Sequence, residues 1–280
     1  MKTFQHTILN KGTISGVGLH TGKVSILKFL PAKINFGIKF QRIDIGNKPI
    51  IKADVDNVIE VERGTTISEN NGKVSTIEHL LAALVGLQID NILIQIDGPE
   101  VPIMDGSSIE FVKCLEKCKI REQDAVRKYL EIPNSISYKD EKNNVEIAAY
   151  PFDDFRVTVM VDYNSQVLGS QHHTLNKVDN FKKDIAKSRT FCFLHEVEEL
   201  FKQDLIKGGD LNNAIVIVDK VLNNNKLQEI SKMIGKKDIK IKKEGILNNT
   251  KLRYNNEPAR HKLLDVIGDL ALVGQPIKGH

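Results

Sequence analysis

The sequence contains few of the features that mark secreted or membrane-spanning proteins. Its 280 residues include no tryptophan and only three cysteines, at positions 114, 118 and 192. A small, odd number of cysteines without zinc-ribbon spacing argues against a disulfide framework, so we expect packed thiols. No run of about 18 apolar residues is present, and the N-terminal residues lack the pattern of a signal peptide. The sequence therefore predicts a protein of the reducing cytoplasm without stable membrane insertion.

The charged residues show no excess of one sign that would indicate a nucleic-acid-binding protein. The chain has 40 lysines and arginines against 36 aspartates and glutamates, and both kinds are scattered along it. The formal net charge of +4 is compatible with an anionic small-molecule substrate, although a well-solvated surface explains it more simply. We therefore predict no nucleic-acid partner.

The first half of the sequence contains short β-prone runs followed by amphipathic helices. Three runs bounded by Gly, Pro and Asn predict strands within residues 4–40. Apolar residues at positions i, i+3, i+4 and i+7 predict a helix over 74–87, which is followed by a strand over 90–96 and a helix over 107–117. The charged segment 119–128 is predicted to connect two domains.

The second half repeats this order of strands followed by an amphipathic helix. The repetition predicts an α+β fold of two similar domains, residues 1–122 and 129–280. The first half continues past its helix with a strand and a second helix, so we expect the second domain to be incomplete and the natural polypeptide to be longer. The predicted elements are strands at 129–132, 145–150, 155–162 and 214–219, helices near 193–205 and over 258–273, and short elements and loops over 223–256.

Two of the predicted helices carry the residues with the clearest chemistry. Glu78 and His79 are adjacent in the first helix, whereas His261, Asp265 and Asp269 are spaced four apart on one face of the last helix. Two imidazoles and one carboxylate are a common ligand set for catalytic zinc, which leaves one coordination position for water. A glutamate next to that position can serve as the general base of a hydrolase.

Each of these residues also has a structural interpretation. His261 and Asp265 can form an ordinary ion pair on an exposed helix face, and His79 can be a hydrogen-bonded core histidine. Ser75 and Glu78 match the pattern of a capping box, in which Glu78 would only cap the start of the helix. Residue types alone therefore support a zinc site and purely structural roles about equally.

Two further features of the sequence are weaker candidates. His172 and His173 follow a polar stretch and are predicted to lie in a surface loop rather than to bind a metal. The glycine-rich segment 16–22 permits a phosphate-binding loop, but it lacks the Walker pattern and no helix plainly follows it.

Six short segments of the sequence occur together in a specific order. Read in this order, they resemble the zinc-dependent UDP-3-O-acyl-N-acetylglucosamine deacetylase family of bacterial lipid A synthesis. Each segment alone is unspecific, but six in the family's order across the chain are very specific. The segments are TISGVGLHTG at 13–22, STIEHLLAAL at 75–84, DGPEVPIMDGS at 97–107, SRTF at 188–191, GGDLNNA at 208–214 and RHKLLDVIGD at 260–269.

The resemblance implies an α+β fold in which the helices of two similar domains are sandwiched between two sheets, with the metal between the domains. It implies zinc as the metal, with ferrous iron as the alternative in the cell. Glu78 would accept the proton of the attacking water, and the Thr190 hydroxyl would stabilise the oxyanion together with the metal. Asp269 would orient a general-acid histidine. The implied metal ligands are His79, His261 and Asp265.

The resemblance also implies an acylated UDP-glucosamine as substrate. The reaction would hydrolyse the N-acetyl group of UDP-3-O-(3-hydroxyacyl)-N-acetylglucosamine, the committed step of lipid A biosynthesis. Lys262 and Phe191 match substrate-facing positions of the family, and His20 matches a position near the substrate. The segment from about 193 to 220 corresponds to an insert whose apolar passage takes the acyl chain. Its candidate lining residues are Leu194, Val197, Leu200 and Leu205.

The sequence departs from the family pattern in the passage and at its C-terminal end. Cys192 stands where the family usually has Gly, and Asp210 and Asn212 replace a more usual Ser and Asp. The general-acid histidine of the family lies past Gly279, so His280 comes too early to be that residue and Asp269 would lack its partner. A fused 3-hydroxyacyl carrier-protein dehydratase after residue 280 is a further expectation, because some bacteria carry this fusion.

Two other functions remain open at the level of sequence. One is a non-catalytic or weakly active sugar-nucleotide binding fragment, and the other is a zinc amidase that acts on another acylated sugar. Retention of Glu78, His79, His261 and Asp265 together favours an active deacetylase, because a site that has lost its activity has no reason to keep all four.

Overall fold

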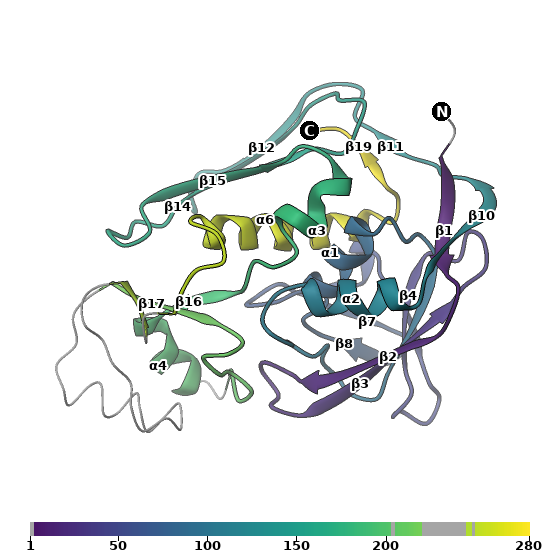
Figure 1. Ribbon diagram of the computed structural model, residues 1–280, viewed down its shortest axis with the longest axis horizontal. Coiled ribbons are helices and arrows are strands. Elements are labelled where there is room, and N and C mark those ends of the chain that lie inside the picture. Colours follow the sequence, from purple (N-terminus) through teal and green to yellow (C-terminus); the bar gives the residue numbers. More distant parts are fainter. Residues whose placement is uncertain (1–2, 203–204, 220–244, 248–249) are drawn as a thin grey trace.

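The chain has a mixed α/β fold with several sheets and few helices in the part that the structure describes (Figure 1). The structure is a computed structural model, and it describes residues 3–202, 205–219, 245–247 and 250–280. Within these residues no helix has both the length and the apolar character needed to cross a membrane.

The largest sheet has five strands in the order β2–β3–β9–β4–β5, and only β4 and β9 are parallel neighbours. Side chains alternate between buried and exposed along its central strands, so one face of the sheet packs against the core. Phe29 and Ile94 are among the fully buried residues of this face. The strands are β2 (Gly12–Val17), β3 (Val24–Pro31), β9 (Ile92–Ile96), β4 (Ile38–Arg42) and β5 (Ile50–Lys52).

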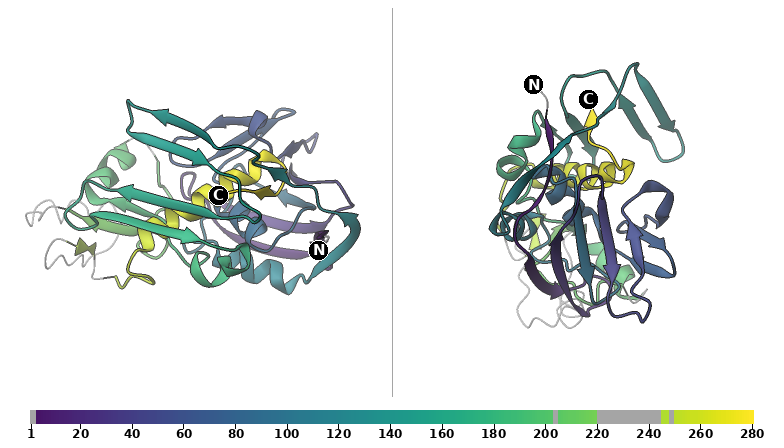
Figure 2. Two further views of the ribbon diagram at one scale, coloured as in Figure 1. Left: turned by 90° about the horizontal axis from the view of Figure 1, so that it is seen from above. Right: turned by 90° about the vertical axis from the view of Figure 1, so that its right-hand side faces the viewer.

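A pair of helices covers this core and carries the candidate site. Helix α1 (Glu78–Gly86) is apolar nearly all round and is buried over its first seven residues, as expected for a central helix. Helix α6 (Glu257–Leu270) packs against α1, and its other side contacts the hairpin of β14 (Val157–Asp162) and β15 (Ser170–Leu175). Figures 1 and 2 show α6 between this hairpin and the five-stranded sheet.

The remaining elements form small sheets and short helices around this core. Helix α2 contacts β2, and α4 packs against a three-stranded sheet formed by β16, β17 and β18. Their bounds are β1 (Phe4–Ile8), β6 (Val58–Glu60), β7 (Thr66–Glu69), β8 (Gly72–Val74), α2 (Ile109–Lys117), β10 (Ile120–Val126), β11 (Leu130–Glu131), β12 (Ile136–Asp140), β13 (Val145–Ala149), α3 (Phe181–Asp184), β16 (Phe191–Phe193), α4 (Leu194–Lys202), β17 (Ile215–Val218), β18 (Gly245–Ile246) and β19 (Ile277–Lys278), with 3-10 turns at Val55–Asn57, Val178–Asn180 and Ala271–Val273.

Most of the predicted helices and strands are confirmed, with ends that differ by a few residues. The predicted helix 74–87 is α1, and the predicted helix 258–273 is α6 followed by a 3-10 turn. All three cysteines are free, as expected, and Cys118 is buried. Most of the predicted loops at 223–256 lie outside the described residues.

The prediction of a connector over 119–128 was wrong. Residues 120–126 form β10, which pairs antiparallel with β1, so that Ile8 faces Ile120. Arg127 is then buried in an ion pair with Asp90, with 2.7 Å between Nη2 and Oδ2. The sequence of this segment is typical of a charged linker because most of its side chains are exposed. Its backbone nevertheless pairs with β1. The division at this segment into two domains therefore stays a prediction.

One smaller expectation was also wrong. His172 and His173 lie in strand β15, where Met160 and Val159 of β14 face them, rather than in a loop. The glycine-rich segment 16–22 is followed by strand β3, which confirms that no helix follows it and that a phosphate loop at the start of a helix is absent there.

Candidate metal centre

The first turn of α1 and the middle of α6 bring the predicted metal ligands together. His79 comes from α1, whereas His261 and Asp265 lie one turn apart on α6. The helices approach closely because residue 268 is a glycine. A Cβ atom at Gly268 would lie only 2.1 Å from the carbonyl oxygen of Glu78, so any side chain there would push the two helices apart.

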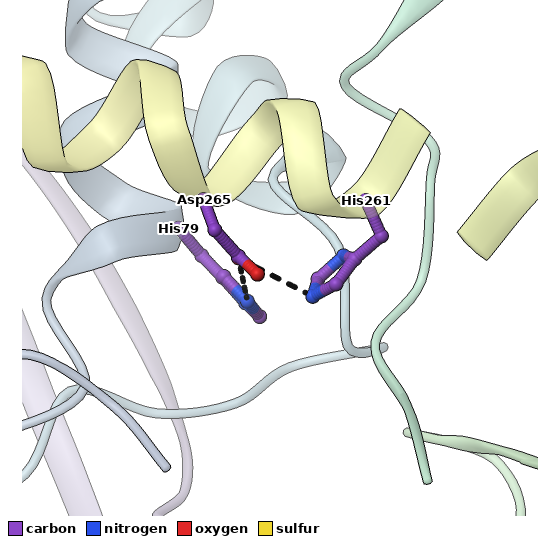
Figure 3. Close-up of side chains that lie close together, drawn as sticks. All are labelled: His79, His261 and Asp265. Atoms are coloured by element: carbon purple, nitrogen blue, oxygen red, sulfur yellow. Dashed lines mark ion pairs between the residues drawn. The ribbon is translucent and has the colours of Figure 1, made fainter. Parts of the chain in front are cut away.

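The three side chains converge on one point (Figure 3). Their ligand atoms all lie within 4.8 Å of one another. Asp265 Oδ1 is 3.4 Å from His261 Nε2 and 3.6 Å from His79 Nε2, and the two imidazole rings are nearly perpendicular, with centroids 4.9 Å apart. These separations are too long for strong hydrogen bonds. They match the spacing of about 3.4 Å expected between two ligand atoms that each lie about 2.0–2.2 Å from a tetrahedral zinc ion.

The protonation states of His261 and Asp265 suit a metal, whereas the pKa of His79 is raised in the metal-free chain because Asp265 and Glu78 outweigh the lowering effect of its burial. Burial lowers the pKa of His261 to about 4, so this imidazole is neutral at pH 7. Its Nδ1 lies 3.0 Å from the carbonyl oxygen of Ser188, to which it donates, and this leaves the Nε2 lone pair directed toward Asp265. Burial opposes ionisation of Asp265, but the neighbouring His261, His79 and Lys262 together outweigh it and lower the pKa of Asp265.

A buried carboxylate oxygen without a partner supports the fit of a divalent cation here. Asp265 Oδ1 is buried and has no hydrogen-bond partner among the described residues. An unpaired buried carboxylate oxygen is costly, and a cation bound by Asp265 Oδ1 and the two Nε2 atoms would satisfy it. The donor set of two imidazoles and one carboxylate is compatible with zinc and with ferrous iron.

Glu78 is buried beside this cluster and does not form a capping box. Helix α1 begins at Glu78 itself, so this residue cannot occupy the third helical position that the capping box requires. Its Oε2 instead accepts a hydrogen bond of 3.0 Å from the backbone N–H of Thr65. Burial raises the pKa of Glu78 to about 7, although the neighbouring His79 opposes this shift. A carboxylate with this pKa can accept and release a proton near neutral pH.

Phe191 and Lys262 lie next to the candidate ligands. The Phe191 ring centroid is 6.4 Å from that of His261, and Lys262 Nζ lies 5.8 Å from the Phe191 centroid. Lys262 Nζ is also 3.4 Å from Asp265 Oδ2. Asp269 lies one turn after Asp265 and accepts a hydrogen bond of 2.7 Å from the Thr65 hydroxyl.

Thr190 and His20 line a small cavity on the α4 side of the site. This cavity has a volume of about 110 Å³. Val197 and Leu200 of the predicted acyl passage line it, whereas Leu194 packs in the small core of this region and Leu205 is not among the lining residues. Phe191 also lines the cavity, which places it between the cavity and the candidate metal ligands.

A larger cavity lies away from this chemistry. It has a volume of about 390 Å³ and is lined by the C-terminal ends of α1 and α6, with Leu84, Ile267 and Leu270 among its walls. None of the predicted site residues lines it, whereas Thr190, Phe191 and His20 line the smaller cavity.

Several residues of this region were missed in the sequence. The Ser188 carbonyl orients His261, and Thr65 contacts both Glu78 and Asp269. Tyr163 packs its ring on Phe191, with centroids 5.5 Å apart, and its buried hydroxyl has no partner in the described part of the chain. A backbone carbonyl has no signature in a sequence, and no motif includes Thr65 or Tyr163.

Comparison with known proteins agrees with this geometry. The sequence pattern of the UDP-3-O-acyl N-acetylglycosamine deacetylase family matches residues 5–237 and 235–280, which together cover nearly the whole chain. The chain belongs to this family. A protein of Acidithiobacillus ferrooxidans named UDP-3-O-acyl-N-acetylglucosamine deacetylase is 38% identical over 99% of the chain and 83% of its own length.

Other members of the family are longer. The "Bifunctional enzyme LpxC/FabZ" of Chlorobaculum tepidum is 48% identical, and the protein of the same name from Bacteroides thetaiotaomicron is 45% identical. These matches cover 99% and 98% of the present chain, respectively. The chain spans 60% of the length of these two relatives.

Proposed function

We propose that this protein hydrolyses the N-acetyl group of UDP-3-O-(3-hydroxyacyl)-N-acetylglucosamine in lipid A biosynthesis, with zinc bound by His79, His261 and Asp265. The observation that carries the proposal is the convergence of these three side chains on one point beside the buried Glu78. The family and the name of the 38% identical relative support the substrate class.

The residues around this point have complementary roles in such a reaction. Zinc, when bound, supplies a Lewis acid that polarises the acetyl carbonyl and makes water more acidic. Glu78 would take the proton of the attacking water, since burial keeps its pKa near neutrality. The Thr190 hydroxyl would donate to the oxyanion, and Asp269 would orient a proton donor for the leaving amine.

The substrate would extend from the metal centre into the small cavity. Lys262 offers a positive charge beside the candidate ligands, which suits an anionic nucleotide sugar. Phe191 would pack on the sugar, and His20 would contact the substrate at the cavity wall. The apolar side chains of Val197 and Leu200 would accept the acyl chain.

The proposal includes two similar domains with the helices between their sheets. It is supported by α6, which contacts α1 on one side and the β14–β15 hairpin on the other. A cytoplasmic location and a fused dehydratase part remain predictions. The names of the two bifunctional relatives support the second of these.

Metal content and activity, measured together, test this function. The purified chain should contain one zinc or iron ion and should release acetate from the acylated nucleotide sugar. UDP-N-acetylglucosamine without the acyl chain should be a much poorer substrate. A metal-loaded chain that releases acetate equally from both compounds would indicate an amidase of other specificity, whereas one that binds the substrate without turnover would indicate a binding module.

A further inference from the structure

One residue outside every family motif discussed above contacts both carboxylates that flank the candidate metal ligands. We propose that Thr65 is a positioning residue that holds Glu78 and Asp269 in their reactive orientation. This inference rests on the proposed function, because it assigns a role within that reaction.

The contacts of Thr65 join the two helices of the site. Its backbone N–H donates to Glu78 Oε2 over 3.0 Å, and its hydroxyl donates to Asp269 Oδ1 over 2.7 Å. Its carbonyl oxygen accepts a longer bond of 3.4 Å from the N–H of Ile77, directly before α1. Thr65 is itself only 6% exposed, so water competes little for these bonds.

The bond from the backbone N–H selects which oxygen of Glu78 is available. A carboxylate has two oxygens, and the bond to Oε2 leaves Oε1 for the proton of the attacking water. The residue before Thr65 is Gly64, and a Cβ atom there would come within 3.4 Å of Glu78 Oε1. Gly64 therefore places no side chain against Oε1, while the Thr65 N–H holds Oε2.

The hydroxyl of Thr65 acts on the second carboxylate. Asp269 lies at the end of α6, and a side chain at this position can rotate unless a partner holds it. A hydrogen bond to a charged group is stronger than one between neutral groups, so the Thr65 hydroxyl can favour one rotamer of Asp269. Because Thr65 also binds Glu78, its two hydrogen bonds together fix the spacing between the Glu78 and Asp269 carboxylates.

Thr65→Val tests this role, because valine keeps the shape and the backbone N–H and removes only the hydroxyl. We expect T65V to keep its metal content and to lose roughly 10–100-fold in kcat, the effect of one hydrogen bond to a charged group. Thr65→Ser, which restores a hydroxyl, should recover most of this loss.

Thr66→Val is the matched control. Thr66 is the next residue, is 3% exposed and has no hydrogen bond to either carboxylate among the described contacts. Both valine variants carry the same change at a buried site, so T66V reports any loss that comes from general destabilisation. Equal kcat values for T65V and T66V would overturn the inference.

A double-mutant cycle and a structure complete the test. Since the hydroxyl acts through Asp269, T65V should reduce kcat little further when it is added to D269N, whereas fully additive losses would contradict the proposal. In a crystal structure of metal-free T65V the Asp269 carboxylate should turn from its wild-type rotamer, and an unmoved carboxylate would also contradict it. A metal-loaded wild-type chain without deacetylase activity would instead overturn the proposed function.

Discussion

The metal centre and the cavity beside it are built from different kinds of structure. The candidate ligands lie on α1 and α6, whose apolar residues belong to the continuous core of the protein. The cavity is walled in part by α4, which packs on a small separate cluster of five buried residues, Leu194, Val197, Val216, Val218 and Leu247. A large shared core holds side chains in single rotamers, whereas a small cluster tolerates changes of shape. We therefore expect changes at the helices to abolish the reaction, and changes at the cavity to alter the choice of substrate.

The largest effect is expected from removal of a metal ligand. His79→Ala or Asp265→Ala should abolish activity and metal binding together, because two remaining ligands hold zinc weakly. Elemental analysis and acetate release should be measured on the same samples. His172→Ala, at an exposed histidine of β15, is the control that should retain both. Full metal occupancy in H79A and D265A would disprove the ligand assignment.

The next effect separates catalysis from stability at Glu78. Glu78→Gln should keep the metal and lower the rate by ~10²–10⁴, the usual contribution of a general base. If Glu78 only accepted the bond from the Thr65 N–H, the variant would instead show mainly a loss of stability of about 1 kcal/mol. Turnover equal to wild type with a lowered melting temperature would favour that structural role.

The E78Q variant also tests how the stability of the fold depends on pH. Burial raises the pKa of Glu78 from 4.5 to about 7, so the folded chain binds this proton more tightly than the unfolded chain. The resulting stability is complete below about pH 4.5 and is lost as the pH rises through 7. Metal-free E78Q should therefore be more stable than metal-free wild type at pH 8, by about 1–3 kcal/mol. Urea unfolding at pH 4 and pH 8 measures the difference, and a lower stability of E78Q at pH 8 would contradict the burial argument.

A smaller effect is expected from the acyl chain of the substrate. Each buried CH₂ group contributes roughly 0.8 kcal/mol, so removal of two should weaken binding about 15-fold. Leu200→Trp, which fills the cavity, should weaken binding of the long-chain substrate and affect a short-chain substrate less. Binding constants measured by calorimetry for both substrates decide this, and equal affinities would argue against an acyl site here.

The smallest effect is expected at Cys192, which lines the cavity where the family usually has Gly. Cys192→Gly should make room for about one more methylene, so the KM for a substrate one carbon longer should fall by about fourfold. The metal content should not change, because Cys192 is not part of the ligand cluster. If the preference for chain length stays the same, Cys192 does not limit the passage.

The helices of the site were predictable from local pattern, whereas one strand was not. Leu80, Leu81 and Leu84 are buried on one helix, so their apolar spacing is visible within a short stretch of sequence. Strand β10 has mostly exposed side chains, so its sequence shows no apolar alternation. Its strand character comes from pairing with β1, which lies more than a hundred residues earlier in the chain.

The sequence by itself determined which chemical groups the candidate site can contain, because residue types and helical spacing show which imidazoles and carboxylates can lie on one helix face. It placed His261 and Asp265 one turn apart and His79 beside Glu78, and the family resemblance assigned them to one metal site. Only the tertiary structure decided which oxygen of Glu78 is held, which nitrogen of His261 carries the proton and which residue joins Glu78 to Asp269. These contacts link backbone and side-chain atoms of residues up to 204 positions apart, and no local pattern records them.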